Sequence, residues 1–190
     1  MPEKDNVRDS VPSEWHLHYR RWMIQDGEPH RCIGETFSWF ALELEVDEPL
    51  AQSNGKEVSA VPIGDYRYQV TAQVKYVGDR SVIVDFGLTA ATSRDNLPKR
   101  CQVGSFVDGV IGLDLPLCLD LMLEEELPSL RYEWRVNRIT ADLTPHISHP
   151  DNPRYCFRDA SRISFSDVTV TSEMQAPDYI LHCANVCSRA

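Results

Sequence analysis

Strict alternation of apolar and polar residues between positions 66 and 76 is the clearest pattern in the chain. The apolar positions share one face of an extended strand and are Tyr66, Tyr68, Val70, Ala72, Val74 and Tyr76. The polar positions between them share the other face, because successive side chains of a strand point to opposite sides. Gly78-Asp79 then favours a tight turn, and residues 81–88 form a second apolar run. We therefore predict a hairpin whose tyrosine and valine face packs inside.

Weaker patterns of the same kind predict further strands at 15–24, 36–46, 104–115, 131–143 and 162–171. Residues 118–127 carry a one-sided apolar stripe that Pro128 ends, which predicts a short helix. From residue 66 onward the order is therefore strand, strand, strand, helix, strand, strand.

That order resembles the five-stranded OB barrel, a Greek-key barrel with a helix at one end. The predicted fold class is mainly β, an antiparallel small barrel with one short helix and extra N-terminal strands, and a β-sandwich is the alternative. We expect residues 1–13 to be a mobile leader and residues 14–190 to form a single β-rich domain, with the barrel at about 66–171.

Charge and composition narrow the function. The formal net charge is −10, which disfavours general binding to nucleic-acid phosphates and favours a basic protein partner. Neither a secretory signal nor a run of about 18 apolar residues is present, so we expect a cytoplasmic protein without a membrane span. The six cysteines are then expected to be free thiols rather than disulfides.

Two histidine patterns are candidate metal sites. His16 and His18 lie two residues apart and would share a strand face, and His30 is a possible third ligand for zinc or another divalent metal. His182, Cys183 and Cys187 form a second group, which would need a distant ligand such as Cys156 or His149. In both cases the alternative is an ordinary structural role. The default expectation is that the protein binds no cofactor.

A long polar loop is the preferred ligand-binding candidate. Its candidate residues are His146, His149, Asp151, Arg154, Arg158 and Arg162. Arginines can clamp a carboxylate or phosphate in bidentate fashion, but Asp–Arg pairs can equally tie such a loop down.

No catalytic triad, nucleophile elbow, P-loop or dinucleotide fingerprint stands out. We therefore predict an acidic, non-enzymatic binding module that engages another protein, as an inhibitor, an immunity-type protein or an accessory subunit. The alternatives are a metal-dependent enzyme or sensor that uses the histidines, and an OB-like domain that binds single-stranded nucleic acid.

Overall fold

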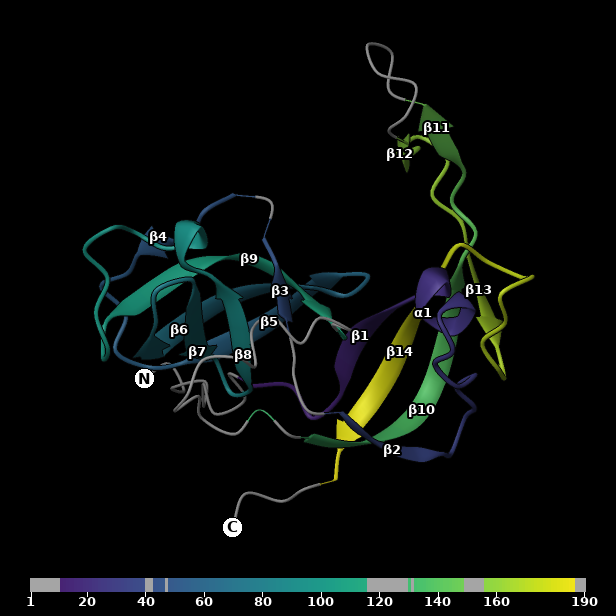
Figure 1. Cartoon of the computed structure of the whole chain (residues 1–190), viewed down its shortest axis with the longest axis horizontal. Helices are drawn as coiled ribbons and strands as arrows, with labels where there is room; N and C mark the ends of the chain where they lie inside the picture. Colours follow the sequence, from purple (N-terminus) through teal and green to yellow (C-terminus); the bar gives the residue numbers. More distant parts are fainter. Residues whose placement is uncertain are drawn as a thin grey trace, which may run out of the picture.

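The computed structural model describes residues 11–39, 43–46, 48–115, 130, 132–148 and 156–186. Within these residues the chain is mainly β, as predicted, and its large sheet curls into a half-barrel (Figure 1). The helix predicted at 118–127 lies outside the described residues. The described α-helix is the short α1 (Arg21–Gln25), which follows the first strand directly. No helix in the described part of the chain has the length and apolar character needed to cross a membrane.

One half of the molecule, which we term the barrel lobe, is built on a circuit of five paired strands. These are β6 (Arg67–Val77), β7 (Ser81–Asp85), β8 (Thr89–Ser93), β3 (Glu43–Glu45) and β9 (Phe106–Asp114). Each strand pairs with the next, and β9 pairs back to β6. A single residue pair, Glu43 with Ala91, joins β3 to β8, so the circuit of strands closes through one pair of residues. Two short strands extend the lobe, β4 (Ala51–Gln52) on β9 and β5 (Ser59–Gly64) on β6.

The hairpin predicted from the alternating pattern is the core of this lobe. Strands β6 and β7 pair antiparallel around a turn in which Gly78 donates its backbone N–H to the carbonyl of Ser81. Tyr68, Val70 and Val74 are 0%, 1% and 0% exposed, whereas the intervening polar side chains reach the surface. The prediction that the apolar face packs inside is confirmed.

The other half, the sheet lobe, is a twisted sheet beside the barrel lobe (Figure 1). Its strands are β13 (Phe165–Val168), β10 (Tyr132–Asp142), β14 (Asp178–Asn185), β1 (Trp15–Arg20) and β2 (Thr36–Trp39). A separate hairpin, β11 (His146–Ser148) with β12 (Cys156–Arg158), projects from this lobe. One hydrophobic core runs through both lobes. Trp15 joins them, because its ring lies 5.3 Å from that of Tyr68 and 5.8 Å from that of Phe86.

Three features differ from the sequence-based expectation. The sheet is mixed rather than antiparallel, because β3 pairs parallel with β8 and β1 pairs parallel with β9. Residues 36–46, expected as one strand, form β2 and β3, which pair in different lobes. Strands β10 and β13, expected to complete the barrel, lie in the sheet lobe, and β3 takes that place between β8 and β9. Alternation shows which residues are buried but not which strand lies beside them, so it could not supply these pairings.

Candidate functional site: a histidine cluster between three strands

Strand β1 presents its histidines on the face opposite the core. Trp15, Leu17 and Tyr19 are buried in the core, so His16 and His18 share the other face, as the two-residue spacing predicted. Strand β14 runs antiparallel to β1 and places His182 directly opposite His16. Two histidines more than 160 positions apart in sequence therefore become cross-strand neighbours.

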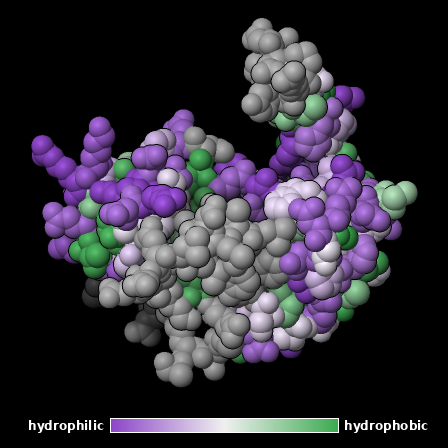
Figure 2. Space-filling view, viewed as in Figure 1, coloured by the Kyte–Doolittle hydropathy of each residue, from purple (hydrophilic) through white to green (hydrophobic). Residues whose placement is uncertain are grey.

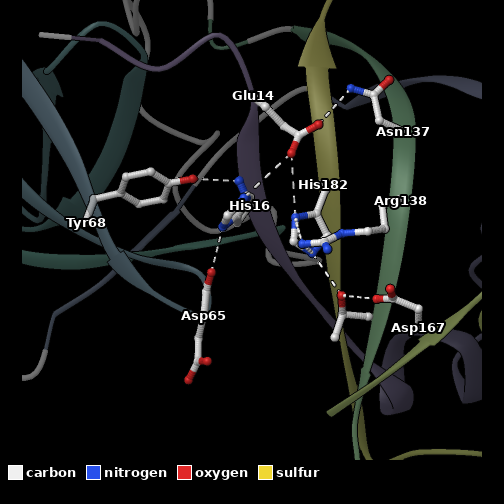
Figure 3. A network of polar contacts seen from close by, with 9 residues as sticks. Glu14, His16, Asp65, Tyr68, Asn137, Arg138, Asp167 and His182 are labelled. Atoms are coloured by element: carbon white, nitrogen blue, oxygen red, sulfur yellow. Dashed lines mark hydrogen bonds and ion pairs between the residues drawn. The ribbon is translucent and has the colours of Figure 1, made fainter. Parts of the chain in front are cut away.

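His16, His182 and Glu14 converge to form what we term the histidine cluster (Figure 3). The two imidazole rings are 4.2 Å apart between centroids. Glu14 Oε1 lies 3.9 Å from His16 Nε2 and 3.7 Å from His182 Nδ1. One potential ligand atom from each of the three residues lies within 4.8 Å of the other two.

The hydrogen bond of His16 assigns the proton on its ring. His16 Nδ1 lies 2.7 Å from the backbone carbonyl oxygen of Asp65, and a carbonyl oxygen only accepts. Nδ1 therefore carries the hydrogen, and in the neutral ring the lone pair is on Nε2, facing Glu14. Asp65 lies in the turn from β5 to β6 with a φ of 50°, a conformation that Asp tolerates better than most residues. That turn positions the carbonyl against β1.

A chain of hydrogen bonds likewise shows which ring nitrogen of His182 carries the hydrogen. The hydroxyl of Thr140 donates to Asp167 Oδ1 at 3.2 Å, because a carboxylate only accepts. Thr140 Oγ1 is 2.9 Å from His182 Nε2 and therefore accepts the Nε2 hydrogen. In the neutral ring the lone pair of His182 is then on Nδ1, again facing Glu14.

His182 is held in the neutral form. Its side chain is 5% exposed. Burial, followed by the proximity of His16 and the positive charge of Arg138, lowers the pKa of His182 to about 4. Its ring is therefore unprotonated at one nitrogen at neutral pH, as metal ligation requires.

A β-bulge in β10 directs two further polar side chains to the cluster. The register slips between Val136, which faces Cys183, and Arg138, which faces His182, so Asn137 is the extra residue. A bulge places two residues opposite one on the partner strand. Asn137 Nδ2 donates to Glu14 Oε2 at 3.0 Å, which leaves Oε1 toward the rings. Arg138 Nη2 lies 3.1 Å from both ring nitrogens of His182, which places it over the face of the ring and leaves the in-plane lone pair on Nδ1 directed at Glu14.

His18 lies in a separate group, the ion-pair cluster, which joins the two lobes. It lies between Glu45 of β3 and Asp178 of β14, with nitrogen–oxygen distances of 3.7 and 3.8 Å, and stacks on the ring of Tyr66 at 4.3 Å. Arg20 completes the cluster by pairing with Asp114 at 2.7 Å.

The ion-pair cluster keeps His18 charged. Burial is the largest single influence and lowers the pKa of His18, but attraction to Asp178, Glu45 and Asp114 outweighs it and raises the pKa to about 9. Conversely, His18 is the main cause that lowers the pKa of Glu45 to about 2, against the effect of burial. A protonated imidazole has no lone pair to offer a metal, so His18 is a cation of the fold rather than a ligand.

The other predicted site residues lie elsewhere. His30 Nδ1 lies 2.8 Å from the Thr171 carbonyl oxygen, away from His16 and His18, so the predicted set of three histidines does not come together. His149, Asp151 and Arg154 lie outside the described residues. His146 faces a hollow of about 330 Å³ that Arg21, Trp22, Gln25, Pro177 and Asp178 also line.

The arginines of the predicted loop make internal ion pairs. Arg158 Nε lies 2.8 Å from Asp142, and its Nη1 lies 3.5 Å from Asp65 of the barrel lobe. Arg162 pairs with Asp159 at 2.5 Å. Figure 2 shows a largely hydrophilic recess between the barrel lobe and the hairpin that carries Arg158. In the described part of this loop, the Arg158 pairs tie separate segments together, whereas the Arg162–Asp159 pair lies within one turn.

Sequence reasoning missed Glu14, and it grouped His182 with Cys183 and Cys187 as a candidate site whose alternative was an ordinary structural role. Glu14 lies two residues before His16, and the spacing that groups His16 with His18 would also have placed it on that face. Cys183 is buried on the core side of β14, opposite to His182, and burial is the main cause that raises the pKa of its thiol. Cys187 lies outside the described residues. The same alternation therefore argues against a joint site of His182 and Cys183.

Comparison of the chain with protein-family models, curated proteins and solved structures finds no match. The geometry of the histidine cluster is therefore the basis for inferring the function of the protein.

Proposed function

We propose that the protein binds one divalent transition-metal ion, with Zn²⁺ the first to test, through Glu14, His16 and His182. The observation that carries this proposal is the direction of the two lone pairs. His16 Nε2 and His182 Nδ1 both face Glu14 Oε1, while the second nitrogen of each ring has its own acceptor in Asp65 or Thr140. Metal-binding histidines typically donate their other N–H to a carbonyl or to a carboxylate-linked group in this way.

The spacing of the donor atoms suits a small metal ion. Zinc held tetrahedrally at about 2.1 Å from each ligand separates the ligand atoms by about 3.4 Å. The carboxylate-to-ring distances are 3.9 and 3.7 Å, so side-chain shifts of a few tenths of an ångström would bring the donors into place. Two imidazoles and one carboxylate leave at least one coordination position for water or another ligand, as in catalytic zinc sites and non-haem iron sites.

Zinc titration of the untagged protein, monitored by calorimetry, tests the proposal. We expect about one Zn²⁺ per chain at this site, and affinity at least 100-fold weaker in Glu14→Gln and His16→Gln. Both side chains are partly exposed, at 41% and 24%, so these variants are expected to fold. His30→Gln, an exposed histidine outside the cluster, is the matched control and is expected to bind as the wild type does.

Cobalt distinguishes this site from the cysteines. Cys32 and Cys156 are exposed and free, so a thiolate site is the competing explanation for any bound metal. Co²⁺ at the histidine cluster gives visible bands without the near-ultraviolet absorption of a cobalt–thiolate bond. Wild-type protein that binds less than about a tenth of a Zn²⁺ per chain, or equal zinc affinity in the wild type and both cluster variants, would overturn the proposal.

We also propose that the barrel lobe is an OB-like barrel whose closing strand is β3. The circuit of five strands and the 3₁₀ turn at Arg94–Asn96 between β8 and β9 support it. Nuclear Overhauser contacts between the backbones of Glu43 and Ala91 test the closure, and their absence would contradict it. Engagement of a basic protein partner, expected from the net charge of −10, stays a prediction.

A further inference from the structure

Arg138 is the one feature of the histidine cluster that a metal site alone does not explain. Its side chain is exposed, and its Nη2 lies against the ring of His182. A guanidinium has five N–H donors and no acceptor, and the His182 ring can accept at most one of them. Among the described residues, Arg138 forms no ion pair with a carboxylate.

A metal ion on the lone pair of His182 Nδ1 would lie beside this guanidinium. The lone pair lies in the ring plane, whereas Arg138 Nη2, at 3.1 Å from both ring nitrogens, lies over the face of the ring. The guanidinium would therefore remain beside a dication. The charges of the metal (+2), Arg138 (+1) and Glu14 (−1) sum to +2, and Asp167, which acts through Thr140, reduces this only to +1. Like charges at such short range raise the free energy of the loaded site unless an anion joins it.

The same geometry offers that anion a binding position. The Glu14 side chain, to which Asn137 donates, is 41% exposed, and Arg138 is exposed as well. Solvent therefore reaches the cluster over β14, the strand between β1 and β10. Arginine binds carboxylate and phosphate groups through two parallel hydrogen bonds. An anion that places one of its oxygens on the metal still has lone pairs left to accept hydrogen bonds from the guanidinium.

We propose that the metal-loaded histidine cluster binds an oxyanion group, a carboxylate or a phosphate, with one oxygen on the open metal position and at least one further oxygen on Arg138. This inference rests on the proposed metal site. It identifies the class of ligand or substrate that the site recognises, and it gives the β10 bulge a role, because the bulge is what directs Arg138 to His182.

The test uses the Co²⁺-loaded full chain with two separate probes, acetate and inorganic phosphate. We expect a saturable change in the visible Co²⁺ bands with at least one probe. Arg138→Gln is expected to weaken that anion affinity at least tenfold while Co²⁺ affinity stays equal or increases, since a neighbouring cation has been removed. Arg135→Gln is the matched control, because Arg135 is also exposed on β10 but lies opposite Ala184.

The outcomes separate the two proposals. A response to acetate alone assigns a carboxylate ligand, and a response to phosphate alone assigns a phosphate ligand. Metal binding without a response to either anion, or equal anion affinity in Arg138→Gln and Arg135→Gln, overturns the oxyanion inference and leaves the metal site standing. Failure to bind Co²⁺ and Zn²⁺ at all overturns the metal site itself.

Discussion

Two polar clusters lie on the same face of the same strand, two residues apart, and they keep their histidines in opposite states. In the histidine cluster, His182 is buried next to another imidazole and an arginine, and its pKa falls to about 4. In the ion-pair cluster, His18 is equally buried, but carboxylates surround it and its pKa rises to about 9. Burial lowers the pKa in both cases, so the sign of the neighbouring charges decides the outcome.

The difference separates a binding role from a structural role. His18 draws its carboxylates from β3 and β14, and Asp114 of β9 adds to the same field, so its charge holds the barrel lobe to the sheet lobe. Among the described residues, the carboxylate in ion-pair contact with His16 and His182 is that of Glu14, whose side chain is the most exposed of the three. Their lone pairs remain directed at that exposed group, which is the arrangement of a ligand site.

Replacement of His18, the central residue of the ion-pair cluster, is expected to have the largest effect. His18→Gln removes the imidazolium that pairs with Glu45 and Asp178, although Arg20 remains 3.8 Å from Glu45. Loss of one partner of a buried ion pair is strongly destabilising. Allowing for the solvent that reaches Glu45, we expect a loss of about 2 kcal/mol in the free energy of unfolding, measured by urea denaturation with a chelator present.

His18→Gln is also expected to keep the zinc affinity of the wild type, measured below the denaturation midpoint. His30→Gln is the control for stability and should change it by less than about 0.5 kcal/mol. A stable His18→Gln variant that no longer binds zinc would invert the roles assigned to the two clusters.

Thr140→Val tests the hydrogen bond that positions His182 in the histidine cluster. Valine matches threonine in shape and suits a strand, but it cannot accept the Nε2 hydrogen of His182. Loss of such an outer partner typically weakens metal affinity 10- to 100-fold, and we expect about tenfold in a zinc titration. Thr71→Val on β6, far from the cluster, should bind zinc normally. Equal zinc affinities in Thr140→Val and Thr71→Val would show that the hydrogen bond from His182 to Thr140 does not support metal binding.

The smallest expected effect is the loss of stability at low pH that protonation of Glu45 causes. Its pKa is lowered in the fold from 4.5 to about 2, so its contribution is present above pH 4.5 and is lost as the pH falls toward 2. Because the side chain is 34% exposed, we expect this part to be on the order of 1 kcal/mol. Urea denaturation of the wild type and of Glu45→Gln between pH 6 and 3 should give curves that converge at the acid end. Parallel curves would show that Glu45 is not paired.

The parts of this account that sequence could predict are those set by local alternation. The inward face of β6, the hairpin to β7, and the shared face of His16 and His18 follow from a period of two and hold in the structure. Glu14, which directly precedes β1, follows from the same spacing applied one step before His16.

The remaining parts depend on contacts between distant segments, which no local pattern encodes. His16 meets His182 only because β1 pairs with β14, and Arg138 reaches the cluster only because one extra residue slips the register of β10. The charge of His18 likewise depends on β3 lying next to β9, where the sequence predicted a single strand over 36–46.

X-ray absorption at the zinc edge of the Zn²⁺-loaded protein tests the central claim most directly, because it identifies the atoms bound to the metal. We expect nitrogen and oxygen ligands at about 2.0–2.2 Å, with the outer scattering of two imidazole rings, and no sulfur. A sulfur shell at about 2.3 Å would contradict it, since the metal would then be held by cysteines.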